Sequence, residues 1–353
     1  MENEGAVRKA FAVQAKSCAD LGSPFTARLS RIIGERLAAD NAVGRAILEW
    51  QGDPAPWADS VPLRLAGALH ALVLSDSNHP LSTAYPPNES THSDNAIWSA
   101  VDGALAGDAE TILRWLQQAP QTNEVRRSSG IFAGLNAIAA ATGATKIGLL
   151  ELGASAGLNL ACDRFGYRFS AGQVLGAADS PLKLVPLWKG AALEAAPFDI
   201  VARAGCDVNP LDIRSAADVL RLRAYTWADQ YDRLERLETA IALAKDAVPE
   251  GALTKADAGE WLQAKLARRA ADAVTVIYHT IAWQYFPDPT VARCQAAIAT
   301  AAASATADAP LAWLAIENDG GNGAAIRLRM WPGGVNRLLG RMDFHGRWVE
   351  WRG

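Results

Sequence analysis

Hydrophobic residues recur three or four positions apart through the first third of the chain, which is the spacing of amphipathic helices. Val7 and Phe11 share such a face, and Ser23-Pro24 is a typical helix start with the serine as cap. A further helix is expected to end near Trp50. Others are expected over 63–74, 96–116 and 123–141, with a polar loop at 75–94 and no strand before residue 146.

From residue 146 onward, short apolar runs alternate with helical patterns. The run Lys146-Ile147-Gly148-Leu149-Leu150-Glu151-Leu152 suits a parallel strand, because strands buried on both faces have nearly continuous apolar sequences. Similar runs lie at 198–202, 251–255, 274–278 and 311–316, and helical patterns lie at 228–244, 260–270 and 291–303. This alternation predicts an α/β fold with a mostly parallel sheet that is covered on both faces.

The end of the chain departs from the alternation. Residues 325–331 and 341–351 resemble strands joined without a helix, so we expect an antiparallel hairpin at the sheet edge. Residues 167–188 fit neither pattern and predict an inserted hairpin or excursion. The expected organisation is therefore an all-helical N-terminal region at 1–122 and an α/β domain at 123–353, with an insertion at about 165–197.

Composition narrows the possible partners. Half of the 353 residues are apolar, 20% are charged, and the mean hydropathy of +0.01 is typical of a globular protein. The 34 basic and 38 acidic residues leave a net charge of −4 without a basic stripe, so we expect no nucleic-acid partner. No apolar run approaches the roughly 20 residues of a membrane span, so we expect no membrane partner either.

The cysteines and the N-terminus favour a reducing compartment. Cys18, Cys162, Cys206 and Cys294 are far apart and form no C-x-x-C pair, which predicts neither a disulfide framework nor a metal site. The first residues, Met1-Glu2-Asn3-Glu4, are acidic where a signal peptide would be basic. The expected location is the cytoplasm.

The most informative segment is Glu151-Leu152-Gly153-Ala154-Ser155-Ala156-Gly157-Leu158-Asn159-Leu160, directly after the first predicted strand. Small residues at 153–157 let the backbone pass close to a ligand, and a helix behind them would point its N-terminal amides there. An acid, a spacer and alternating small residues form the pattern of an S-adenosylmethionine loop. In that hypothesis the methionine end of the cofactor is held by Glu151, which accepts from its ammonium group, and by Gly153, Ser155, Gly157 and Asn159.

Other chemistries compete for this turn. Gly153-x-Ser155-x-Gly157 also matches the nucleophile elbow of α/β-hydrolases. Either Asp257 and His279 or Asp319 and His345 follow downstream in the right order. The long helical region before the first strand, and Glu151 beside a developing oxyanion, weigh against a hydrolase. A nicotinamide-binding turn needs G-x-G-x-x-G and an acid about 20 positions later, which are lacking. A tight turn with a purely structural role is the remaining interpretation.

Acidic residues also follow the next two predicted strands. Asp207 comes after the second strand, where its carboxylate could accept from both ribose hydroxyls of a nucleoside. Asp257 follows the third strand and could accept from an adenine amino group. Each acid could instead cap a helix. Because the carboxyl ends of parallel strands share one edge of the sheet, the combination favours a ligand crevice there.

The loop after the fourth strand carries a histidine and several aromatic residues. His279 could act as a general base on a methyl acceptor, while Trp283 and Tyr285 could line its pocket. The alternative is a buried histidine among core aromatics. Methyl transfer depends mainly on alignment and desolvation, so such enzymes need no distinctive catalytic residue.

Together, the segments at 151–160, 203–212, 279–285 and 345–348 resemble an uncharacterised bacterial family of unknown function. That family looks like class I methyltransferases, which implies a Rossmann-like domain behind the helical region and S-adenosylmethionine as cofactor. The resemblance also points to Arg127, which could reach an anionic substrate or the cofactor carboxylate, or could simply belong to a solvated helix start. We expect the helical region to cover the crevice and select substrate, and the alternative is that it only buries the sheet or makes a dimer contact. The expected activity is methyl transfer to a small-molecule substrate. A serine esterase using Ser155 and a non-catalytic interaction module are the alternatives.

Overall fold

The computed structural model describes residues 2–88, 92–170 and 173–353, and the chain folds into two compact units. The helical unit comprises Met1–Thr122 and Arg214–Glu235. The sheet unit comprises Asn123–Ile213 and Arg236–Gly353. The helical unit thus includes a segment from the second half of the sequence, which a division into two continuous regions does not provide.

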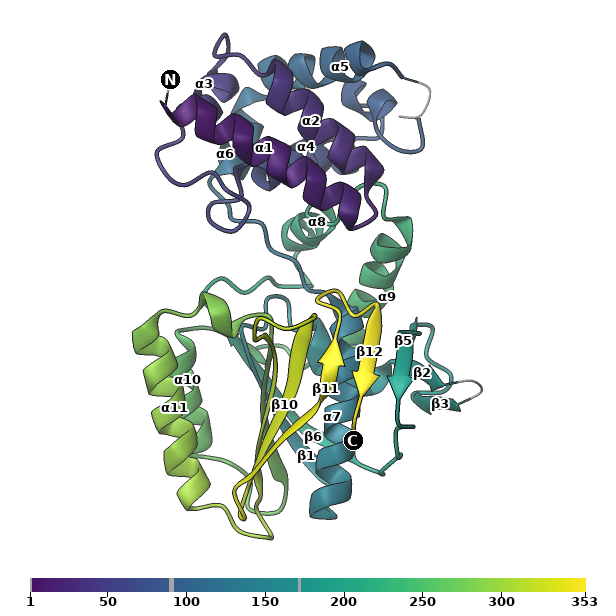
Figure 1. The fold of residues 1–353 in the computed structure, drawn as a ribbon, viewed down its shortest axis with the longest axis vertical. Coiled ribbons are helices and arrows are strands. Elements are labelled where there is room, and N and C mark those ends of the chain that lie inside the picture. Colours follow the sequence, from purple (N-terminus) through teal and green to yellow (C-terminus); the bar gives the residue numbers. More distant parts are fainter. Residues whose placement is uncertain (1, 89–91, 171–172) are drawn as a thin grey trace. The chain divides into compact units, whose positions relative to one another are not determined.

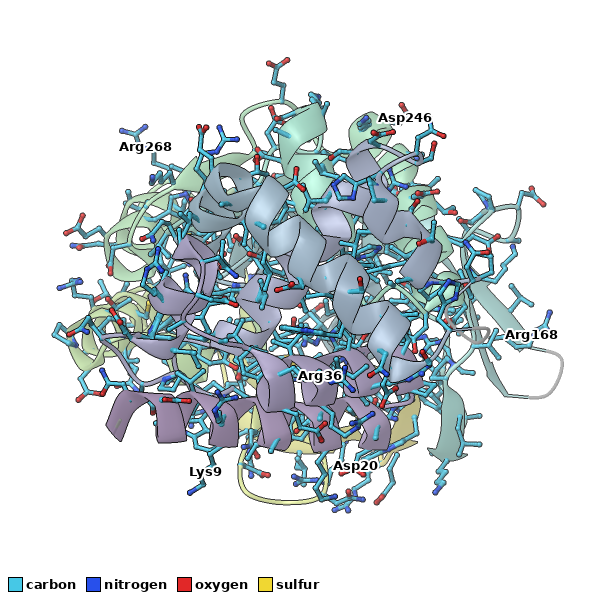
Figure 2. All side chains as sticks on the ribbon, turned by 90° about the horizontal axis from the view of Figure 1, so that it is seen from above. Lys9, Asp20, Arg36, Arg168, Asp246 and Arg268 are labelled. Carbon is cyan, nitrogen blue, oxygen red and sulfur yellow. The ribbon has the colours of Figure 1, made fainter. Side chains whose placement is uncertain are left out.

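The helical unit, whose helices are drawn in Figure 1, is built around one apolar core. This core contains Phe11, Leu29 and Leu65. Its elements are α1 (Glu2–Asp20), α2 (Pro24–Arg36), α3 (Ala42–Leu48), α4 (Val61–Ser75), the 3-10 helix η1 (Pro80–Ala84), α5 (Asp94–Gly107), α6 (Ala109–Leu116) and α8 (Ala216–Ala224). Helix α9 (Tyr231–Ala247) begins in this unit and ends in the other. Charged side chains such as Lys9 and Asp20 lie on its surface (Figure 2).

Polar contacts attach residues 214–235 to the N-terminal helices. Asp229 accepts hydrogen bonds from the Ser23 hydroxyl and from the Phe25 amide, the latter at 2.8 Å. The His70 ring contacts the Ala224 carbonyl at 3.2 Å. Ser23 is the N-cap residue of α2 and Pro24 its first residue, as expected, although the Ser23 hydroxyl donates to Asp229 and makes no capping bond within the helix.

The sheet unit has a Rossmann-like strand order. Its large sheet runs β5-β12-β11-β10-β9-β8-β1-β6-β7, and the strands from β9 to β7 are mutually parallel. The parallel strands are β1 (Lys146–Leu152), β6 (Asp199–Asp207), β7 (Leu253–Lys255), β8 (Val274–Thr280) and β9 (Leu311–Asn318). The chain builds outward from β1 through β6 to β7 and then crosses back to β8. The topological switch point therefore lies between β1 and β8.

Helices cover both faces of this sheet. On β9, Trp313 packs against the cluster formed by α10 (Ala258–Leu266) and α11 (Asp288–Ala303), while Leu314 contacts Gly134 of α7 (Ser128–Thr142). Figure 1 shows these three helices beside the strands of the sheet unit. Neighbouring residues of a strand point to opposite faces, so α7 and the α10–α11 pair lie on opposite sides. Glycines 130 and 134 let α7 approach closely, because a methyl group there would come within 2.6 Å of sheet side chains.

The C-terminal strands form the predicted antiparallel extension. They are β10 (Ala324–Trp331), β11 (Val335–Met342) and β12 (Trp348–Trp351). The predicted insertion contributes β2 (Gly166–Ser170), β3 (Gln173–Gly176) and β4 (Lys183–Leu184), which form a separate small sheet. It also contributes β5 (Leu187–Gly190), which pairs in parallel with β12 at the edge of the large sheet. The α/β fold class is confirmed, with a helical region before the sheet.

One local expectation next to the glycine turn is wrong. The segment after it forms a 3-10 helix, η4 (Leu158–Arg164), with non-helical geometry at Ala161, where an α-helix was expected. The cause lies in the chain that follows, since Phe165 and Tyr167 are fully buried at the start of the inserted sheet. In the described ranges, none of the helices has the length and apolar character needed to cross a membrane. The cysteines are unpaired and buried.

Candidate functional site

The candidate site lies at the carboxyl ends of β1, β6 and β8. In open α/β sheets, ligands bind in the crevice at this edge, next to the topological switch point. Strand β1 ends in the glycine turn at residues 153–157, and β8 ends in the loop that begins at Ile281. Both chain segments that flank the switch point therefore carry residues that the sequence singled out.

The glycine turn has an unusual backbone and tight packing. Gly153, Ser155 and Gly157 have positive φ angles of 68°, 53° and 69°. A methyl group on Gly153 would come within 2.6 Å of the Ala282 methyl, so the turn packs directly against the loop after β8. Positive φ is costly for a serine, which indicates that neighbouring contacts hold this conformation.

Asp207 ties the turn to the second strand. Its carboxylate accepts hydrogen bonds from the backbone amides of Ser155 and Asn209, each at 2.9 Å. The Ser155 carbonyl in turn accepts from the Leu211 amide at 3.1 Å. A carboxylate offers about four acceptor positions, so each Asp207 oxygen has a further lone pair for a ligand. The structure thus brings the predicted ribose acid and the predicted cofactor turn into direct contact.

Glu151 is buried at the end of β1, with 2% of its surface exposed. Its carboxyl accepts a hydrogen bond from the Tyr278 hydroxyl of β8 at 3.0 Å. Burial raises the pKa of Glu151 to about 8, although hydrogen bonds from Tyr278 and Asn159 and the charge of Arg127 act to lower it. Glu151 is therefore predominantly protonated at pH 7, and it connects β1 to β8 beneath the turn.

Asn159 and Arg127 complete this buried group. The Ser128 hydroxyl donates to the Asn159 side chain at 2.7 Å, which joins the start of α7 to η4. Arg127 donates to the carbonyl oxygens of Phe344 at 2.8 Å and Thr280 at 3.3 Å. Arg127 therefore holds the end of β8 and the loop after β11 together at the candidate edge.

His279 is buried in an aromatic cluster, and both of its ring nitrogens are used. Nε2 lies 2.9 Å from the Trp313 indole N–H, which can only donate, so Nε2 is the unprotonated acceptor. Nδ1 then carries the proton and donates to Glu317 at 2.7 Å. Trp283 stacks on the ring with centroids 4.7 Å apart. This geometry leaves His279 without a ring nitrogen for a methyl acceptor.

Asp257 is engaged at the start of α10, and Tyr285 is exposed to solvent. Asp257 caps α10 by accepting from the amides of Gly259 and Glu260, and its other oxygen accepts from Thr290. Arg293 adds an ion pair at 3.1 Å. Asp257 thus has the capping role that was the alternative to adenine recognition. Tyr285 has 68% of its surface exposed.

A bacterial family profile, described as "Uncharacterized protein conserved in bacteria (DUF2332)", matches residues 8–351. The chain belongs to this family. No curated protein and no solved structure matches the chain. The family description names no activity, so the chemistry of this DUF2332 protein has to be argued from its site.

Several residues of the site in this DUF2332 chain could not be identified from the sequence alone. Tyr278 and Ser128 are ordinary members of apolar or small-residue segments, and only the fold brings them to Glu151 and Asn159. Glu317 does carry a signal, because it is an acid near the carboxyl end of the fifth parallel strand. Besides His279, it accepts from the backbone amides of Ala282 and Trp283 at 3.0 and 3.1 Å.

Proposed function

We propose that the sheet unit binds S-adenosylmethionine across the carboxyl ends of β1 and β6 and transfers its methyl group to a small molecule. The observation that carries this proposal is the contact between Asp207 and the glycine turn beside the switch point. An acid at the end of the strand next to β1 is well placed to accept from the two hydroxyls of a ribose.

Some of the residues singled out for S-adenosylmethionine are arranged to hold it, and others have structural roles instead. Asp207 supplies carboxylate acceptors for a ribose, and the turn at 153–157 lets backbone approach a ligand. Glu151 lies beneath the turn, where it supports the turn and β8 instead of offering an open carboxylate. Asp257 already serves α10, so adenine would be recognised by other groups. S-adenosylmethionine would supply an electrophilic methyl group, and the chain would bind, orient and desolvate the acceptor.

The test is isothermal titration calorimetry with S-adenosylhomocysteine on the full chain. We expect the wild type to bind and Asp207→Asn to bind at least tenfold more weakly, because one ribose acceptor is lost. Asp199→Asn is the matched control, since this exposed acid begins the same strand at its opposite end. Circular dichroism checks that each variant is folded. No heat with the wild type, or equal affinities for both variants, would refute the proposal.

A serine esterase is the second candidate, because Ser155 has the positive φ of a strained turn. Its Oγ atom is buried and makes no hydrogen bond to any described residue, so none of these residues acts as a base that would activate it as a nucleophile. Covalent labelling by a fluorophosphonate that is lost in Ser155→Ala would favour the esterase. An interaction module with this fold would give neither labelling nor a thermal shift with S-adenosylhomocysteine.

A further inference from the structure

A polar cavity of about 240 Å³ lies in the sheet unit beside the first turn of α7. It is lined by Arg126, Ser129, Gly346 and Arg347 and by residues 184–186 of the inserted segment. One water molecule needs only roughly 10–15 Å³ of such space. The cavity is therefore large enough for a small ligand or for the charged group of a larger one.

Ser129 places an unused hydrogen-bonding group in this lining. The residue has 0% of its surface exposed, and its Oγ atom has no hydrogen-bond partner among the residues that the structure describes. A buried hydroxyl without a partner is destabilising, so such groups in folded proteins call for an explanation. Ser129 also lies in the first turn of the 15-residue helix α7, where the helix dipole favours an anion.

Arg347 is held in place by its own carboxylate partner. Its Nε and Nη2 atoms donate to the two oxygens of Asp343, each at 2.8 Å. Asp343 also accepts from the backbone amides of His345 and Arg347, which shapes the turn that carries the arginine. A guanidinium has five N–H donors, so this pairing orients Arg347 and leaves donors for an anion.

Arg126 lies against the same turn from the other side. Gly346 has a φ of 72°, and a methyl group on it would come within 2.6 Å of the Arg126 backbone. The close contact brings both arginines to one cavity although they are far apart in the sequence. Among the described residues, the lining contains two guanidinium groups and no carboxylate.

The inserted segment supplies the remaining wall. Leu184, Val185 and Pro186 line the cavity, and the next residue, Leu187, donates its amide to the Arg347 carbonyl at 2.8 Å. Strand β5 then pairs with β12, which fixes this wall to the large sheet (Figure 1). Val185 has 61% of its surface exposed and gives the cavity an apolar side. The insertion thus has a role in building the cavity.

We infer that this cavity binds the phosphate group of a small molecule. Two guanidinium groups, a hydroxyl donor and the start of a helix match the several acceptor oxygens and the negative charge of a phosphate. The buried Ser129 hydroxyl would donate to one of these oxygens. The inference uses none of the residues proposed to hold S-adenosylmethionine, so either proposal can fail without the other.

The test is calorimetry of the full chain with inorganic phosphate, at an ionic strength kept constant with sodium chloride. We expect saturable binding that Ser129→Ala and Arg126→Gln each weaken about tenfold, as expected for the loss of a hydrogen bond to a charged group. Ser129→Ala should not lower the unfolding temperature, because it removes a hydroxyl that forms no hydrogen bond within the described part of the chain. Acetate at the same ionic strength should bind at least tenfold more weakly than phosphate.

Arg337→Gln is the matched charge control. Arg337 lies on β11, outside the cavity lining, and donates to the Gly353 carbonyl oxygen at 2.8 Å. Its replacement removes the same charge and should leave phosphate affinity within twofold of the wild type. Absence of saturable binding, unchanged affinity in Ser129→Ala, equal weakening by Arg337→Gln, or equally tight acetate binding would each overturn the inference.

Discussion

Replacing Glu151 by glutamine should change how the stability of the protein depends on pH. In the folded protein, burial raises the pKa of Glu151 from 4.5 to about 8. Between these two values the unfolded chain has released the proton and the folded protein keeps it. The free energy of unfolding of the wild type therefore falls as pH rises through this window. Glutamine at this position resembles the protonated carboxyl and does not titrate.

The size of the effect follows from the shift of the pKa. One pH unit corresponds to about 1.4 kcal/mol for a single proton, so between pH 5 and 8 the variant should gain about 4 kcal/mol relative to the wild type. Near pH 5 the two proteins should differ little, since glutamine can still accept from Tyr278.

The assay is urea unfolding of the wild type and Glu151→Gln at several pH values between 5 and 8. Glu250→Gln is the control, because Glu250 is exposed and undergoes the same chemical change. Infrared spectroscopy adds a direct readout, since the wild type should show a protonated carboxyl band that titrates near pH 8 and is missing in Glu151→Gln. If the stability profiles of the wild type and Glu151→Gln run parallel, Glu151 is ionised at neutral pH and the reasoning from burial is wrong.

Two further substitutions test the neighbourhood of the site. Trp313→Phe removes the indole N–H that donates to His279 Nε2, and the loss of this hydrogen bond should lower the free energy of unfolding by about 1–3 kcal/mol in urea denaturation. An unchanged value would contradict the assigned hydrogen bond. Gly346→Ala should cost about 2 kcal/mol and weaken phosphate binding, because its methyl group would meet the Arg126 backbone. Gly333 also has a positive φ, but nothing lies within 4 Å of a methyl group added there, so Gly333→Ala is the control. Equal phosphate affinities in the two alanine variants would contradict the close contact between Gly346 and Arg126.

Strands that are buried on both faces could be predicted from the sequence. Strands that also carry charged residues could be predicted only in part. Every residue of β8 is buried, and its apolar run was located within two residues of its ends. Strand β6 continues to Asp207, beyond the apolar run at 198–202. The charged Arg203 interrupts the apolar run, so the sequence pattern ends before the strand does. The Arg203 side chain is satisfied by an ion pair with Asp163 at 2.7 Å. A partner 40 positions earlier in the chain gives no local signal for a strand.

The position of the candidate site in the fold could be predicted from the sequence. The hydrogen-bond partners of its side chains could not. Alternation of strands and helices is sufficient to place the glycine turn and Asp207 at one edge of a parallel sheet. The partners of His279 depend on the register of the neighbouring strand. His279 lies opposite Ala315, which puts Trp313 and Glu317 two residues to either side on the same face. A shift of one residue would have turned both away from the histidine.

The short 3-10 segment after the glycine turn changes where an anion is best bound. In the usual arrangement a helix after the first strand presents its N-terminus to a phosphate or carboxylate. Here η4 has seven residues and non-helical geometry at Ala161, so that contribution is reduced. The longer helix α7 starts beside Arg126, and Arg127 in the same segment reaches the end of β8. We therefore expect recognition to be divided, with a nucleoside at Asp207 and a phosphate at the first turn of α7. Double variants that combine Asp207→Asn with Ser129→Ala should then lose both affinities independently.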